Sequence, residues 1–143
     1  MSHVVLDDHL LRDLLADSPS PGLQRILRMR SPATTNLYYV RLCRSAVAAT
    51  GGALTGSWSA DRRRALADAL TTLPDDVRIV SMRTLAFDMA TLAADHGLSR
   101  LGAEAIAACR MLDAPLYVDE FDDGPRIRAA AAASRIRYRV LAR

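Results

Sequence analysis

Two short, largely apolar segments, far apart in the chain, each end abruptly in acidic residues. They are His3–Leu6 followed by Asp7 and Asp8, and Pro115–Val118 followed by Asp119 and Glu120. Short apolar runs of this kind are typical of buried strands in a parallel sheet, whose carboxyl ends form the edge at which ligands bind. If the two strands are parallel neighbours, their acids converge, and they then need a cation between them or a raised pKa. The sequence therefore predicts an acidic site for a divalent metal ion.

The remaining apolar patterns alternate between helix and strand periodicity, which predicts a parallel sheet covered by helices on both faces. Helices are expected at 9–16, around 23–27, at 37–49, from Ser59 or Asp61 to 73, at 84–95, from Ser99 to 112, and from Pro125 onward. Strands are expected at 3–7, 77–80, 115–119 and 138–141, whereas 31–34 stays open between a strand and a turn. We expect a single α/β domain over residues 1–143, built as an α/β/α sandwich.

Composition narrows the class of protein further. Half of the 143 residues are apolar, which suits a chain that folds around one core. No apolar run approaches the roughly 20 residues needed to span a bilayer, and no signal peptide is visible. The two cysteines lack metal-ligand spacing and predict free thiols. We therefore expect a cytoplasmic protein without a membrane partner.

All nineteen basic residues are arginine, and the net charge is +3. Guanidinium groups bind phosphates in a bidentate manner, but the codon bias of a GC-rich genome accounts for the same composition, and we favour that explanation. The sequence contains no phosphate-binding P-loop, no Gly-x-Ser-x-Gly elbow and no paired-histidine zinc motif. A flavodoxin-like receiver is also excluded, because it requires a lysine that this chain lacks.

The order of these elements resembles the PIN domain, the fold of VapC-type toxins and of several RNA-processing nucleases. The resemblance covers nearly the whole chain and is clearest in Val4–Asp7 with the leucine-rich segment after it, and in 98–141. It implies a PIN-like fold and an Mg²⁺- or Mn²⁺-dependent ribonuclease of toxin type. It also implies a homodimer and a small antitoxin-like protein partner, with RNA as the target.

The acidic positions of that family map onto this chain only in part. The first acid corresponds to Asp7, and the fourth to Asp119 or Glu120 with Asp122 just behind. The second falls near Tyr38 and the third at Gly102, where no carboxylate stands. Under this resemblance the catalytic residues are Asp7, Asp119 and Glu120, the metal ligands are Asp7, Asp119 and Asp122, and the accessory acids are Asp8 and Glu104. The two positions without an acid motivate an alternative: an inactive PIN-like module that binds RNA or a protein partner.

Several of these residues also have structural explanations. Asp8 is expected to cap the N-terminus of the helix that follows it, and Asp122 and Asp123 to cap the helix that begins at Pro125. Glu104 is expected at an exposed helical position. Tyr38 suits packing against the sheet better than stacking on a base.

Overall fold

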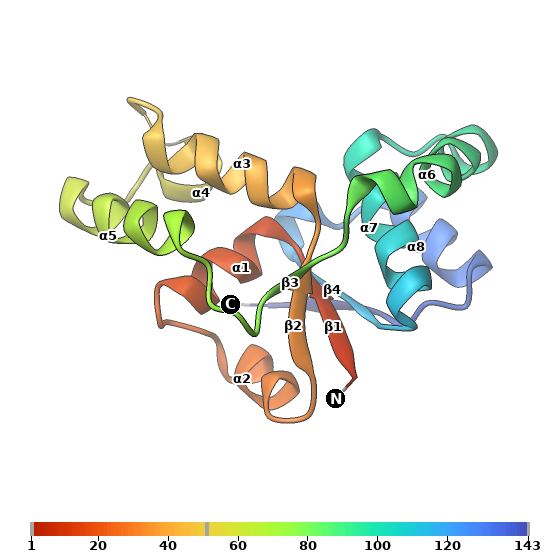
Figure 1. The fold of residues 1–143 in the computed structure, drawn as a ribbon, viewed down its shortest axis with the longest axis horizontal. Helices are drawn as coiled ribbons and strands as arrows, with labels where there is room; N and C mark the ends of the chain where they lie inside the picture. The colour runs from red at the N-terminus through yellow and green to blue at the C-terminus, as the bar shows by residue number, and fades with distance from the viewer. Residues whose placement is uncertain (1, 51, 143) are drawn as a thin grey trace.

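The computed structural model describes residues 2–50 and 52–142 (Figure 1). The predicted strands and helices follow one another in the expected order, with an additional short helix at Gly52–Thr55 that was not predicted. The strands are β1 (His3–Leu6), β2 (Ser31–Thr34), β3 (Arg78–Ile79), β4 (Leu116–Asp119) and β5 (Tyr138–Leu141). The helices are α1 (Asp8–Leu15), α2 (Pro21–Leu27), α3 (Asn36–Val47), α4 (Gly52–Thr55), α5 (Ala60–Thr71), α6 (Met82–His96), α7 (Arg100–Leu112) and α8 (Pro125–Ala133), with a 3-10 turn, η1 (Glu120–Asp122). The segment left open at 31–34 is therefore a strand.

The strands form one parallel sheet in the order β3-β2-β1-β4-β5. From β1 the chain builds the sheet outward through β2 and β3, and then returns to the other side of β1 to add β4 and β5. The direction of winding thus reverses between β1 and β4, where Val5 pairs with Leu116 and Leu6 with Tyr117. Such a reversal point is where open α/β sheets bind ligands, at the carboxyl ends of the strands. The prediction that the two acidic strands are parallel neighbours is confirmed.

Alternating side chains of the central strands enter two different cores. Val5, Leu116 and Val118 pack with residues of α6, α7 and α8. Val4 and Leu6 point to the opposite face, where they pack with residues of α1 and α2. This alternation follows from the two-residue period of a strand, and it requires helices on both sides of the sheet. The predicted α/β/α arrangement is confirmed.

The helix boundaries follow from capping residues in the sequence. Ser20, Thr35, Ser59 and Ser99 each accept a hydrogen bond from the backbone N–H three residues later, which satisfies a donor that the helix leaves free. Helix α6 ends at Gly97, whose φ of 63° is left-handed and favours glycine. These local rules explain why Ser59, Ser99 and Pro125 mark helix starts as predicted.

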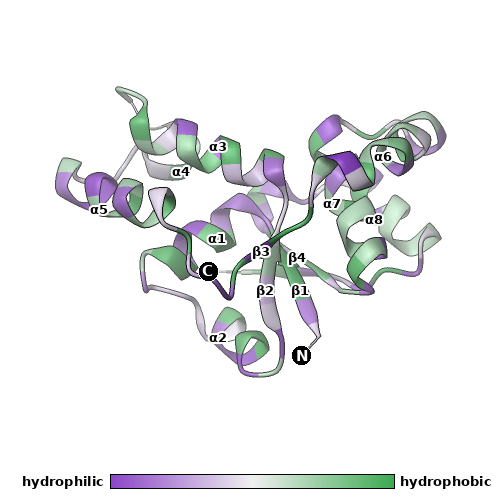
Figure 2. Ribbon diagram, viewed as in Figure 1, coloured by the Kyte–Doolittle hydropathy of each residue, from purple (hydrophilic) through white to green (hydrophobic). Residues whose placement is uncertain are grey.

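A third core joins α1 to the outlying helices α3, α4 and α5, through buried leucines that include Leu11, Leu42 and Leu66. Figure 2 shows many hydrophilic residues along α5, which forms the outer edge of this group. Arg62 of α5 stacks over the Trp58 ring at 3.6 Å. Within residues 2–50 and 52–142, none of the helices has the length and apolar character needed to traverse a lipid bilayer.

Candidate functional site

Asp7 joins the ends of the two acidic strands. It follows β1 directly, and its side chain is fully buried. One carboxylate oxygen, Oδ1, accepts the Leu10 N–H at 2.9 Å and so caps α1. The other, Oδ2, accepts the Asp119 N–H at 2.8 Å, at the end of β4. The two backbone donors hold this carboxylate rigidly at the point where the winding of the sheet reverses.

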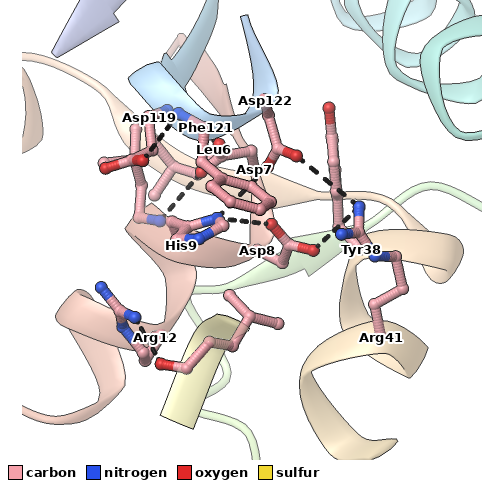
Figure 3. A network of polar contacts seen from close by, with 12 residues as sticks. Leu6, Asp7, Asp8, His9, Arg12, Tyr38, Arg41, Asp119, Phe121 and Asp122 are labelled. Carbon is pink, nitrogen blue, oxygen red and sulfur yellow. Dashed lines mark hydrogen bonds and ion pairs between the residues drawn. The ribbon is translucent and has the colours of Figure 1, made fainter. Parts of the chain in front are cut away.

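Next to Asp7, two more carboxylates share two cationic side chains (Figure 3). The Nδ1 atom of His9 lies 3.1 Å from Asp8 Oδ1 and 3.3 Å from Asp122 Oδ2, so its N–H is shared between the two carboxylates. On the other side, the Arg41 guanidinium of α3 lies 3.2 Å from Asp8 Oδ2 and 3.7 Å from Asp122 Oδ1. We call Asp7, Asp8, His9, Asp122 and Arg41 the acidic cluster. It links three parts of the fold: the start of α1, the middle of α3 and the segment after β4.

Burial and charge shift the pKa values within the acidic cluster. Burial is the largest cause, and the proximity of Asp122 the next, of a pKa of Asp7 that is raised well above its usual value. The pKa of Asp8 is also raised, chiefly by burial, although the His9 hydrogen bond opposes this. Burial alone would lower the pKa of His9, but hydrogen bonds to Asp122 and Asp8 outweigh it and raise the pKa to about 10. Burial would likewise raise the pKa of Asp122, yet its bond with His9 lowers it. At neutral pH the cluster therefore contains an imidazolium, which partly neutralises the acids.

The donor atoms of the acidic cluster have a spacing that suits a metal ion. Asp7, Asp8, His9 and Asp122 each offer one ligand atom, and these atoms all lie within 4.8 Å of one another. Two ligands on opposite sides of Mg²⁺ are about 4.2 Å apart, and on opposite sides of Ca²⁺ about 4.8 Å. Three of the four donors are carboxylates, the ligands that hard cations prefer. The residues therefore fit a divalent cation, which would replace the proton that His9 shares with the two aspartates.

The other predicted acids lie around this group but outside it. Asp119 is buried, and its Oδ2 accepts the Phe121 N–H at 3.0 Å, which caps the turn η1. Glu120 is exposed at the start of that turn. The side chain that approaches the other acids from this segment is that of Asp122, which η1 turns back toward α1 (Figure 3).

Two of the capping predictions are wrong. Asp7, rather than Asp8, caps α1, because the extended residue that precedes the helix is Asp7. Helix α8 has Gly124 as its N-cap and no side-chain capping bond, so neither Asp122 nor Asp123 serves that helix. Asp123 instead accepts the Tyr138 hydroxyl at 2.7 Å and pairs with Arg128 at 2.7 Å.

The expected exposure of Glu104 is also wrong, because this side chain is fully buried. Its carboxylate accepts the Leu37 N–H at 2.8 Å and the Asn36 Nδ2 amide at 3.0 Å, both in the first turn of α3. The small residues around Glu104 in α7 allow α3 to approach closely enough for these bonds. Glu104 therefore holds the start of α3, which is the helix that carries Arg41.

The predicted site residues did not include two members of the acidic cluster, His9 and Arg41. The resemblance contained a signal for Arg41: it maps the family's second acid near Tyr38, and Arg41 lies three residues later on the same helix face. Tyr38 itself is buried and packs in the core with Val5 and Leu85, which confirms its predicted packing role.

Comparisons with known proteins identify a similar fold but no family. No family model matches the chain, and no curated protein matches it. A solved structure described as a toxin-antitoxin complex from Klebsiella pneumoniae contains a chain with a similar fold, at a TM-score of 0.55 and 15% sequence identity. The match covers 84% of this chain and 88% of that chain. The chain thus shares its parallel α/β fold with a chain of that structure.

Proposed function

We propose that this chain is a toxin-like ribonuclease that depends on Mg²⁺ or Mn²⁺, held by Asp7, Asp8 and Asp122. The observation that carries the proposal is the convergence of three carboxylates and His9 at the reversal point of the sheet. Crowded, buried carboxylates need compensating charge, and hard cations prefer oxygen ligands. A divalent ion at this position satisfies both requirements.

The residues around the ion have separate tasks in this proposal. A bound divalent cation polarises a phosphoryl oxygen and lowers the pKa of a coordinated water. Asp7 is oriented for ligation by its two backbone donors, one of which is the Asp119 N–H. We assign this orienting task to the Asp119 N–H. The sequence-based role of the Asp119 side chain as a metal ligand and catalytic residue stays a prediction. The same holds for Glu120, which is exposed beside the site.

A basic cavity beside the acidic cluster favours a polyanionic substrate for the proposed enzyme. Its volume is about 300 Å³, and Arg41, Arg44, Ser45 and Thr50 are among its lining residues. Arg41 belongs to both places, because the same guanidinium pairs with Asp8 and Asp122. Guanidinium groups bind phosphate oxygens strongly, so a phosphate next to the cleaved one suits this cavity. We therefore infer that RNA crosses the site along α3.

The proposed assembly is a homodimer that binds a small antitoxin-like protein. The support for a protein partner is the likeness of fold to a chain that was solved in a toxin-antitoxin complex. Mass spectrometry of the protein purified from its own host under native conditions tests this: twice the chain mass plus a small second chain is expected, and the bare monomer would contradict it.

RNA cleavage tests the function directly. Wild-type protein should cut single-stranded RNA in Mg²⁺ or Mn²⁺ and lose this activity in EDTA. Asp122→Asn should lose activity by about a hundredfold or more, because one ligand charge is gone. Asp123→Asn is the matched control: it removes the neighbouring carboxylate, which binds Tyr138 instead, and should retain activity. Intact RNA in both metals at high protein concentration, or equal cleavage by both variants, would overturn the proposal.

A second candidate is an inactive module that binds a protein partner or RNA without cutting it. One observation favours it: His9 and Arg41 already pair with the acids that a metal ion would need. In that case titration calorimetry should show no Mn²⁺ binding at millimolar concentration, and Asp122→Asn should leave partner binding intact. Calorimetric Mn²⁺ binding that disappears in Asp122→Asn would exclude this candidate.

A further inference from the structure

A second cavity adjoins the acidic cluster at Asp122, and Arg126 is among its lining residues. Its volume is about 400 Å³, within the usual range of about 300–1,000 Å³ for small-molecule sites. Leu98, Leu101, Pro125 and Ile127 give it apolar walls, contributed by the turn between α6 and α7, the first turn of α7 and the start of α8. Helices α6, α7 and α8 pack against one another here, so the walls belong to rigid elements.

Two residues connect this cavity to the acidic cluster. Asp122 lines the cavity and also contacts His9 and Arg41, so a ligand in the cavity lies next to the proposed metal site. Tyr38 lines it as well, and Figure 3 shows its side chain beside Asp122 and Arg41. Tyr38 is only 1% exposed. Within the described part of the chain its hydroxyl forms no hydrogen bond, although its backbone N–H does. Because Tyr38 lines the cavity, a ligand bound there can hydrogen-bond with this hydroxyl.

We propose that this cavity binds a nucleobase of the RNA, adjacent to the phosphate that is cleaved. The inference rests on the proposed nuclease function and adds to it a site that selects the base. A base has flat apolar faces that suit the leucine and isoleucine walls, and a polar edge that can bond with the Tyr38 hydroxyl. Its own phosphate would then lie over Asp122 and near Arg41. An aliphatic side chain of a protein partner would fill the walls but would leave the hydroxyl unpaired.

Gly102 is a position from which a larger side chain would enter the cavity. This residue lies in the first turn of α7 and lines the cavity. A Cβ added there would meet Ile127, Leu98 and Ser99 side-chain atoms at 3.7 Å, which is ordinary contact. A longer side chain at this position projects further into the space that a base would occupy. The capping bond from the Gly102 N–H to Ser99 uses the backbone and is retained.

Calorimetric titration with the four nucleoside 5′-monophosphates and with ribose 5-phosphate, in Mg²⁺, tests the inference without requiring cleavage. At least one monophosphate should bind about tenfold more tightly than ribose 5-phosphate, because only the former carries a base to bury. Gly102→Leu should remove this difference, and Tyr38→Phe should reduce the preference among the four bases. Ala90→Leu, at an exposed position of α6, is the matched control and should bind like the wild type. Thermal melting should show that all three variants are folded.

Each outcome separates this inference from the proposed function. Cleavage of RNA without any preference for monophosphates over ribose 5-phosphate would overturn the base site and leave the nuclease standing. Base-dependent binding that Gly102→Leu removes, in a protein that cuts no RNA, would support the base site alone. Unchanged monophosphate binding in a folded Gly102→Leu protein would overturn the base site.

Discussion

Two buried acidic regions of this molecule are stabilised by different means. Glu104 is a single carboxylate with uncharged donors, the Leu37 N–H and the Asn36 amide, and within the described residues it has no ion-pair partner. The acidic cluster instead brings three carboxylates together and places His9 and Arg41 among them. A lone carboxylate can be satisfied by directed N–H groups at a helix start. Several carboxylates at contact distance repel one another, so they need a cation between them or a raised pKa. Glu104 therefore stabilises the fold, whereas the cluster is suited to exchanging one cation for another.

Replacement of Glu104 by alanine should produce the largest loss of stability. Two partly buried donors in α3 lose their acceptor, and the free energy of unfolding should fall by about 3 kcal/mol. Glu104→Gln keeps one acceptor oxygen and should lose about 1 kcal/mol. Urea denaturation with and without Mn²⁺ measures both. A smaller stabilisation by Mn²⁺ in the alanine variant than in the wild type would break the comparison, because it would make Glu104 part of the metal site.

Loss of Arg41, unlike loss of Glu104, should change the affinity for Mn²⁺ more than the stability of the fold. Arg41→Gln removes one of the two cations, and its partly exposed guanidinium limits the cost in stability to about 1 kcal/mol. Affinity for Mn²⁺ should rise about tenfold, because the acids lose a competing positive charge. Arg44→Gln, one turn along the exposed face of α3, is the control. Calorimetric titration gives the affinities, and weaker Mn²⁺ binding by Arg41→Gln than by Arg44→Gln would contradict the view that Arg41 occupies the cation's place.

The stability of the metal-free protein should fall as the pH rises from about 6.5 to about 10. The pKa of His9 is raised to about 10 in the folded state, so its pairing stabilises the fold fully below its unfolded pKa of about 6.5 and is lost as the pH rises. The raised pKa of Asp7 acts in the same direction. The lowered pKa of Asp122 matters only in strong acid, where stability is lost as the pH falls. Saturating Mg²⁺ should flatten the alkaline decline of the melting temperature, because the ion substitutes for the lost protons. A melting temperature independent of pH without metal would refute this account.

The smallest effect should come from Asp123, which lies next to Asp122 in sequence but outside the cluster. Its pKa is lowered mainly by the Tyr138 hydroxyl, with a smaller contribution from Arg128 at the surface. Asp123→Asn retains an acceptor for Tyr138, so the free energy of unfolding should change by at most about 0.5 kcal/mol. Metal affinity should not change. A loss of Mn²⁺ binding comparable with that of Asp122→Asn would show that the cluster extends beyond its contacts in the structure.

Local patterns in the sequence were sufficient to predict most of the fold. Apolar runs and capping residues placed the strands β1, β4 and β5 and the starts of α5, α7 and α8, because these depend on neighbours within a few residues. The adjacency of β1 and β4 was predicted from their shared acidic ends and is confirmed by their pairing. Asp7 was predicted as a site residue in the same way, because a residue at the carboxyl end of a central strand lies at the edge of the sheet where ligands bind.

Only the tertiary structure decided which of the other acids meet. Asp122 rather than Asp119 approaches Asp8, because the turn η1 reverses the chain after β4. Glu104 is buried because α3 crosses α7 at that point, and Arg41 enters the cluster from a helix that no local pattern places there. Helix and strand follow from short-range periodicity, which a sequence displays directly. The partner of a buried charge depends on how separate elements cross, and that is determined by the packing of the whole domain.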